Sequence, residues 1–179
     1  MIFKAGEGAG RSGSFFFFSH DKKFIIKTMS KGEHCLFLDL IPSLSKHYID
    51  NPDSLIAKIF GVFTVRCSRM DEVHIMLMEN TLQIKDDKQL RYIFDLKGSR
   101  VDRKVKGITT KSTTLKDINF LMAANVNKHF TDLGDNKRRI LTALRKDIEF
   151  LRVSKLMDYS LLLGIEKVRT QSMAEKKIM

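Results

Sequence analysis

The chain has 179 residues, 43% of them hydrophobic and 30% charged, a balance that excludes an intrinsically disordered class and allows one domain with a core. Its 32 lysine and arginine residues outnumber 21 aspartate and glutamate residues, and the net charge of +11 predicts an anionic partner: nucleic acid, an anionic membrane or a phosphate-rich ligand. No apolar run approaches the roughly 20 residues of a membrane span, and the first residues lack the apolar core of a secretory signal. Because Cys35 and Cys67 have no ligand-like spacing, we expect a reducing, intracellular setting.

The first half of the sequence is predicted to be rich in strands. The apolar runs of SFFFFSHDKKFIIKTM, separated by SHDKK, are typical of a β-hairpin. Residues 31–50 have a helical pattern, which we expect Pro42 to kink or split, and a turn follows at 51–54. Three further strands are predicted, at 58–66, 72–80 and 91–96.

The second half is predicted to contain a loop, a long helix and a strand. Residues 97–117 are polar and basic and favour a loop. Four apolar residues at helical spacing predict an amphipathic helix over 135–156, with Asp135 as a candidate cap: Ile140, Leu144, Ile148 and Leu151. A buried strand is expected at 160–168. Strands in the first half and a long helix in the second indicate an α+β fold.

A glycine-rich segment at 8–13 fits the pattern G-x-G-x-x-G. Almost nothing precedes it, and a phenylalanine-rich strand rather than a helix follows it, which argues against a dinucleotide fold and against a Walker-type loop. A glycine-rich turn between two strands is instead how kinases cover phosphates, and a lysine on the next strand then meets those phosphates. Lys27 lies at that place, and Glu33 is a candidate carboxylate partner; the local residues alone favour an exposed lysine on a hairpin.

Two further segments allow a functional and a structural interpretation. The predicted strand at 72–80 breaks into Asn80, Thr81 and Leu82, which is compatible with an adenine hinge, although the local residues favour an ordinary strand end. The segment DLKGSRVDRKVKG gathers basic residues around Gly-Ser, which favours a phosphate site over a solvated loop: Lys97, Arg100, Arg103, Lys104 and Lys106. No aromatic residues interleave with this basic run and no RNA-binding or zinc-finger signature is present, so nucleic-acid binding is disfavoured.

The segment KLMDYSLLLG places one carboxylate, Asp158, between apolar residues, where the predicted helix ends and a predicted strand begins. Locally it is typical of a turn residue. With these stretches combined, residues 8–168 resemble the phosphatidylinositol phosphate kinases, and DLKGS and MDYSLL are the most specific matches. NPDSL and TLKDINF are similar to the phosphatidylinositol 4-phosphate 5-kinase branch, whereas MEN and the phenylalanine before DLKGS are similar to the branch that phosphorylates phosphatidylinositol 3-phosphate. The subfamily therefore stays open.

The resemblance implies an α+β, protein-kinase-related two-lobe architecture with an antiparallel sheet, and it implies roles for single residues. It assigns a catalytic group in which Asp158 is the catalytic aspartate and two basic residues serve phosphate, Lys97 and Arg103. It assigns a nucleotide-binding group of Ser12, Gly13 and Ser14 in the phosphate-covering loop, Lys27 with Glu33, and Asn80, Thr81 and Leu82 at the hinge. ATP and Mg²⁺ are the implied cofactors, and no residue of this sequence is assigned as a metal ligand.

Two departures from kinase patterns bear on activity. Met157-Asp158 replaces Arg-Asp of the protein-kinase catalytic loop, and Leu163 stands where protein kinases place a metal-binding asparagine. The family continues to an Ile-Ile-Asp segment whose aspartate holds magnesium and to an activation loop that selects the lipid, and the sequence reaches Met179 without either. We therefore expect a kinase domain over 1–168 that is incomplete at its C-terminal side and a polar tail over 169–179. If these 179 residues are the whole protein, we expect weak or absent catalysis; if they are a fragment of a longer protein, the missing parts lie elsewhere in it.

Three functional hypotheses follow from the sequence. The first is an ATP-dependent lipid kinase that phosphorylates an inositol-ring hydroxyl of a phosphoinositide, peripheral on the cytoplasmic face of an anionic membrane, with a homodimer left open. The second is a catalytically inactive phosphoinositide- or membrane-binding module. The third, which is less favoured, is a nucleic-acid binder driven by the positive charge.

Overall fold

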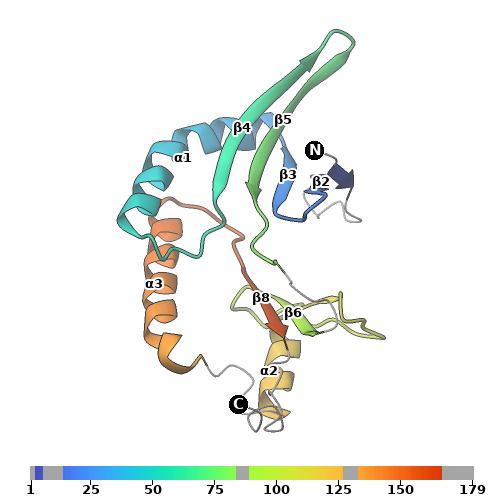
Figure 1. The fold of residues 1–179 in the computed structure, drawn as a ribbon, viewed down its shortest axis with the longest axis vertical. Coiled ribbons are helices and arrows are strands. Elements are labelled where there is room, and N and C mark those ends of the chain that lie inside the picture. Colours follow the sequence, from blue (N-terminus) through green and yellow to red (C-terminus); the bar gives the residue numbers. More distant parts are fainter. Residues whose placement is uncertain (1–2, 6–13, 84–88, 127–132, 167–179) are drawn as a thin grey trace, which may run out of the picture. The chain divides into compact units, whose positions relative to one another are not determined.

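The computed structural model describes residues 3–5, 14–83, 89–126 and 133–166, which fall into two compact units (Figure 1). The first unit comprises Met1–Gln83 with Asp132–Met157, and the second comprises Ile84–Thr131 with Asp158–Met179. Both are mixed α/β, and antiparallel pairing dominates both sheets, as the sequence predicts. Within the described ranges, no helix is both long and apolar enough to cross a membrane.

The sheet of the first unit has five strands in the order β1-β2-β3-β5-β4. They are β1 (Phe3–Ala5), β2 (Phe16–Ser19), β3 (Phe24–Met29), β4 (Ile59–Cys67) and β5 (Met70–Glu79). The predicted hairpin is confirmed, because β2 and β3 pair antiparallel with Phe16 opposite Lys27. β4 and β5 form a second, longer hairpin (Figure 1), which confirms both strand predictions there.

The turn between β2 and β3 is built from polar side chains rather than from glycine. Asp21 Oδ1 accepts hydrogen bonds from the Ser19 hydroxyl at 2.7 Å and from the Lys23 N–H at 3.2 Å. Lys22 takes the left-handed conformation with φ 56°. These contacts satisfy the polar groups of the turn and so fix the register that aligns Lys27 in β3.

Helix α1 (Lys31–Asp50) runs through Pro42 without interruption, so the expectation of a split helix is wrong. A proline removes only one hydrogen bond of the helix, and here the other turns and a strong N-terminal cap outweigh that loss. Ser30 Oγ accepts from the Glu33 N–H at 3.2 Å, and Glu33 Oε2 accepts from the Ser30 N–H at 2.8 Å, which completes a capping box.

Helix α3 (Lys137–Val153) confirms the predicted amphipathic helix, but Asp135 does not cap it. Asp135 lies in a short 3₁₀ turn, η1 (Gly134–Asn136), which leads directly into the helix, and no side chain caps its start. The buried polar residue Asp147 of this helix accepts from His47 Nε2 of α1 at 2.7 Å and from the Leu55 N–H at 2.7 Å. α1, α3 and the segment between α1 and β4 are therefore joined at one buried carboxylate.

The second unit is built around β6 (Leu90–Leu96), which lies between β7 (Thr114–Leu115) and β8 (Leu161–Glu166). Phe94 of β6 is fully buried, and its ring meets Phe120 of α2 (Asp117–Val126) edge to face at 5.3 Å between centroids. Helix α2 and the short β7 lie partly within the stretch predicted as loop and were missed. The prediction of a buried strand at 160–168 is wrong in its burial, because β8 is an edge strand with half-exposed leucines.

Candidate active site

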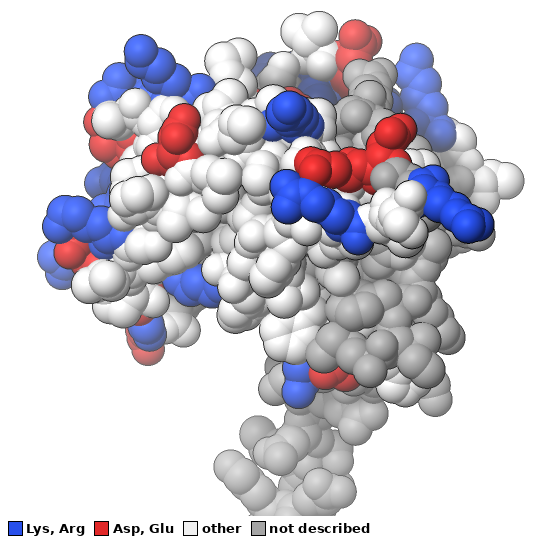
Figure 2. Space-filling view, turned by 90° about the horizontal axis from the view of Figure 1, so that it is seen from above, with Lys and Arg blue, Asp and Glu red and all other residues white. Residues whose placement is uncertain are grey.

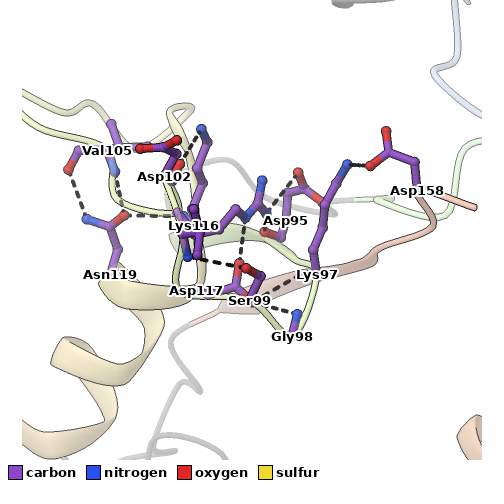
Figure 3. A network of polar contacts seen from close by, with 12 residues as sticks. Asp95, Lys97, Gly98, Ser99, Asp102, Val105, Lys116, Asp117, Asn119 and Asp158 are labelled. Atoms are coloured by element: carbon purple, nitrogen blue, oxygen red, sulfur yellow. Dashed lines mark hydrogen bonds and ion pairs between the residues drawn. The ribbon is translucent and has the colours of Figure 1, made fainter.

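Asp117, at the start of α2, anchors the DLKGS segment (95–99) of the second unit (Figure 3). It is 8% exposed, and its Oδ1 accepts from the backbone N–H groups of Lys97 at 3.0 Å and Gly98 at 2.8 Å. Gly98 takes a left-handed conformation with φ 71°, which glycine adopts without strain. Burial raises the pKa of the Asp117 carboxyl, but the hydrogen bonds to it lower the pKa more, so it stays below its ordinary value.

Arg103 is held between two carboxylates of the same unit. Its Nε donates to Asp117 Oδ2 at 2.7 Å, and its Nη2 donates to the carbonyl oxygen of Asp95 and lies 3.3 Å from Asp95 Oδ2. Only 11% of the Arg103 side chain is exposed. The hydrogen bond with Asp117 and the charge of Asp95 raise the pKa of the Arg103 guanidinium, so it stays charged. These contacts give Arg103 a clear role in closing the 95–103 segment.

Lys97 and Asp158 form an ion pair across two separate parts of the second unit. Lys97 Nζ donates to Asp158 Oδ1, and the Asp158 side chain is 84% exposed, so it is open to a ligand. Asp158 takes the left-handed conformation with φ 62° just before β8. The hydrogen bond from Lys97, and the charges of Lys97 and Arg103, hold the pKa of the Asp158 carboxyl below its ordinary value. It is therefore ionised at neutral pH and ready to accept a hydrogen bond.

Asp95 completes the network from β6. Its Oδ1 is buried and makes no hydrogen bond within the described residues, while its Oδ2 faces Arg103. The network thus joins two sequence-predicted residues of the catalytic group through Asp117, which sequence reasoning did not select. The partners of Asp117 lie 14 to 20 residues away in sequence, and only the sequence TLKDINF hinted at its importance.

Lys27 lies in β3 of the first unit, with its Nζ 3.9 Å from Glu33 Oε1. The side chain of Lys27 is 29% exposed and that of Glu33 is 43% exposed. Hydrogen bonds from Ser30, and the nearby charge of Lys27, hold the pKa of the Glu33 carboxyl below its ordinary value. Glu33 therefore has two partners: it caps α1 with one carboxylate oxygen and faces Lys27 with the other.

The structure describes four of the six other residues that were predicted to bind the nucleotide. Asn80 is 8% exposed, and its side chain donates to the Lys22 carbonyl at 2.7 Å and accepts from the Leu82 N–H at 3.2 Å, so it braces the end of β5. Thr81 is exposed and Leu82 is half-buried. Ser14 is buried at 5% exposure, whereas Ser12 and Gly13 lie outside the described residues. The roles predicted for these residues stay predictions.

The described residues contain no group of three histidine, cysteine, aspartate or glutamate side chains that could hold a metal ion. Mg²⁺ usually takes one or two carboxylates together with substrate phosphates rather than a cage of protein ligands.

Comparison with known proteins identifies the family. A family model described as phosphatidylinositol-4-phosphate 5-kinase matches residues 2–178. A probable phosphatidylinositol phosphate kinase of Dictyostelium discoideum is 40% identical over 159 residues, which cover 87% of this chain and 21% of that protein. A phosphatidylinositol 4-phosphate 5-kinase of Schizosaccharomyces pombe is 35% identical over 163 residues, which cover 89% of this chain and 21% of that protein.

A third relative, phosphatidylinositol 4-phosphate 5-kinase type-1 beta of Gallus gallus, is 32% identical over 170 residues, covering 94% of this chain and 30% of that protein. The chain thus spans between a fifth and a third of the length of these relatives. The family model covers nearly every residue, including the DLKGS and MDYSLL segments that build the network around Asp117. The chain belongs to the phosphatidylinositol-4-phosphate 5-kinase family.

Proposed function

We propose that this chain supplies the kinase domain, or a part of it, of an enzyme that transfers the γ-phosphoryl group of ATP to an inositol-ring hydroxyl of a membrane phosphoinositide. The observation that carries the proposal is the pair of Lys97 and Asp158, a cation and an exposed carboxylate presented together by the network around Asp117. Family membership supports the reaction class, and the names of the relatives support a phosphatidylinositol phosphate as substrate.

In the proposed reaction, a hydroxyl oxygen of the inositol ring attacks the γ-phosphorus while the bond to the β-phosphate oxygen breaks, and ADP departs with the bonding electrons. Asp158 accepts the hydrogen bond of the attacking hydroxyl and then its proton, which orients the nucleophile. Its lowered pKa makes it a better orienting group than a strong base. Lys97 has three N–H donors, so it can contact Asp158 and a substrate phosphate at once.

The first unit supplies the nucleotide side of the proposed reaction. Lys27 meets the ATP phosphates, and Glu33 keeps its ammonium group in place when no nucleotide is bound. The segment of Thr81 and Leu82 receives the adenine. We propose that the two units correspond to the two lobes of a kinase-related architecture, and that Mg²⁺ arrives with ATP and neutralises its phosphate charge.

Further parts of the proposed enzyme lie outside these residues. The support is the greater length of the relatives, of which the chain covers 21% to 30% in the three described above. We place the magnesium-binding segment and the activation loop expected from the family resemblance among these parts. We also place the enzyme on the cytoplasmic face of a membrane, where its lipid substrate lies.

A lipid phosphorylation assay tests the proposal. The chain is grafted into a longer relative in place of the matching residues, so that the further parts are present. The purified protein is incubated with labelled ATP, Mg²⁺ and vesicles that contain phosphatidylinositol 4-phosphate, and the labelled lipid is separated and counted. We expect transfer that D158N and K27A each lower at least about 100-fold, because each removes one group that acts on the transferred phosphoryl or its acceptor. The matched control D102N changes an exposed aspartate of the same unit and keeps transfer. Vesicle binding without transfer would overturn the proposal in favour of an inactive lipid-binding module.

A further inference from the structure

The segment 100–111 of the second unit, hereafter the 100–111 loop, combines basic and apolar side chains at the surface. It has five basic residues and one acidic residue. Arg103 is committed to its carboxylate partners, but the other four basic side chains are exposed and form no ion pair with a described residue: Arg100, Lys104, Lys106 and Lys111. Figure 2 shows one face of the molecule, on which lysine and arginine side chains form separate groups with acidic side chains beside some of them.

The loop also exposes apolar side chains that no described residue covers. Val101 is 79% exposed, and Ile108 is 102% exposed, so Ile108 has lost none of its contact with solvent. Ile108 follows Gly107, which has φ 90°. A single exposed isoleucine is common on protein surfaces and by itself means little. Here it lies among unpaired lysines, and the backbone on both sides of it is held in place.

Side chains of the second unit fix the loop before and after its tip. On the near side, the Val105 N–H donates to Asn119 Oδ1 at 2.9 Å, and Asn119 Nδ2 donates to the Val105 carbonyl at 3.1 Å (Figure 3). On the far side, the Thr110 N–H donates to Thr113 Oγ1 at 2.8 Å, and the Thr113 N–H donates to the Thr110 carbonyl at 3.0 Å. Polar anchors therefore hold the backbone on both sides of the tip at 106–109.

An anionic lipid bilayer is the partner that suits this combination. Lysine and arginine near such a surface are attracted to the lipid phosphates, and an adjacent apolar side chain gains by entering the boundary between headgroups and acyl chains. The 100–111 loop contains no aromatic residue on which a nucleic-acid base could stack. A protein partner would need an apolar patch of larger extent than these two side chains.

We propose that the 100–111 loop is a membrane-docking element, in which Lys104 and Lys106 contact anionic headgroups and Ile108 enters the bilayer boundary. The inference deepens the proposed function and rests on it, because Lys97 lies in the segment that directly precedes the loop in sequence. A docked loop brings the surface of the bilayer to the unit that carries Lys97 and Asp158. A phosphoinositide headgroup then reaches them without leaving its membrane.

The charge contribution is tested by vesicle sedimentation with the whole chain. Phosphatidylcholine vesicles with and without phosphatidylserine are the probes, so no phosphoinositide recognition is involved. Each lysine near an anionic surface is worth about a fivefold change in affinity, so K104Q/K106Q is expected to weaken binding to the anionic vesicles roughly 25-fold. The matched control K31Q/K46Q removes the same charge from exposed positions of α1 and is expected to cause a much smaller loss. Equal losses in the two pairs would overturn the proposal.

The insertion of Ile108 is tested by fluorescence. The chain has no tryptophan, so I108W carries the sole indole reporter. We expect its emission to shift to the blue on anionic vesicles and to be quenched by lipids brominated on the acyl chain. The control I49W places the reporter at an equally apolar position of α1 that is 80% exposed, and its emission is expected to stay unchanged. An unchanged emission of I108W on vesicles that do bind the chain would overturn insertion.

The outcomes separate this proposal from the proposed function. D158N is expected to bind anionic vesicles as the parent chain does, whatever its effect on phosphoryl transfer. If no phosphoryl transfer is measured but K104Q/K106Q loses vesicle binding, membrane docking is supported and the proposed kinase reaction is contradicted. If K104Q/K106Q weakens binding to duplex DNA and leaves vesicle binding intact, the loop is a nucleic-acid contact and docking falls.

Discussion

The carboxylate of Asp117 accepts hydrogen bonds from three N–H groups: two backbone amides of the DLKGS segment and the guanidinium of Arg103. A buried carboxylate is stable only when such donors replace water. Arg103, which the sequence suggested as a phosphate ligand, links Asp117 with Asp95, and its predicted role toward phosphate stays a prediction. At the residue scale, the DLKGS segment is therefore shaped by a buried carboxylate, Asp117, and the segment presents the side chain of Lys97 to Asp158.

We predict that D117N lowers the free energy of unfolding by about 3 kcal/mol at neutral pH, because an amide cannot satisfy Arg103 and both backbone donors. The pKa of Asp117 is lowered in the folded state, so the stability that it contributes is present above its unfolded value of 3.8 and is lost as the pH falls below it. Urea unfolding of parent and D117N across this range should show the two curves converge in acid.

The control for this prediction is D102N, which changes an exposed carboxylate of the same segment. Its stability is expected to match that of the parent at every pH. A difference between parent and D117N that stays constant into acid would show that the charge of Asp117 contributes nothing, and the account of the network would then be wrong.

The elements of the first unit are joined by polar contacts as much as by apolar packing. His47 of α1 is 8% exposed, its ring stacks on Phe150 of α3 at 4.4 Å, and it bonds Asp147, which also accepts the Leu55 N–H. The helical periodicity predicted α3, but the inward position of Asp147 could not be predicted, because the partners that make its burial tolerable lie 92 and 100 residues away in sequence. Only folding brings them together.

We predict that D147A lowers the free energy of unfolding by about 3 kcal/mol, since it leaves His47 and the Leu55 N–H buried without their acceptor. The measurement is the urea midpoint at constant slope. D53N serves as the control, because Asp53 forms an exposed ion pair with Arg139 of the same helix, and such pairs are screened by solvent. A midpoint of D147A no lower than that of D53N would contradict the role given to the buried carboxylate.

At the scale of the whole molecule, the sequence predicted elements that depend on local patterns, and it did not predict contacts between residues that are far apart in the sequence. Alternating and apolar runs predicted the strands, and helical spacing predicted α1 and α3. The sequence of α2, DINFLMAANV, is apolar on all sides and lacks the helical periodicity that marked α3, so the helix was missed. Burial of β8 was overpredicted, since a leucine run cannot tell a central strand from an edge strand. The DLKGS and MDYSLL segments gave Lys97 and Asp158, which the structure pairs directly.

The net charge of +11 acts on the molecule as a whole, and its effect should depend on ionic strength. The screening length falls from about 10 Å at 0.1 M salt to about 3 Å at 1 M salt. We predict that binding to phosphatidylserine-containing vesicles falls steeply over this range, whereas the weak binding to neutral vesicles does not. Sedimentation at increasing salt measures both, and salt-independent binding to the anionic vesicles would exclude an electrostatic origin.

The left-handed backbone of Asp158 limits which residues can replace it. Asparagine and glycine adopt this conformation readily, whereas β-branched residues clash with their own backbone there. The replacements that the fold tolerates best are therefore ones that delete the carboxylate and leave the chain intact. In a lineage released from selection on the proposed reaction, a single change at this position would yield a stably folded relative that keeps the proposed docking loop and lacks the proposed proton acceptor.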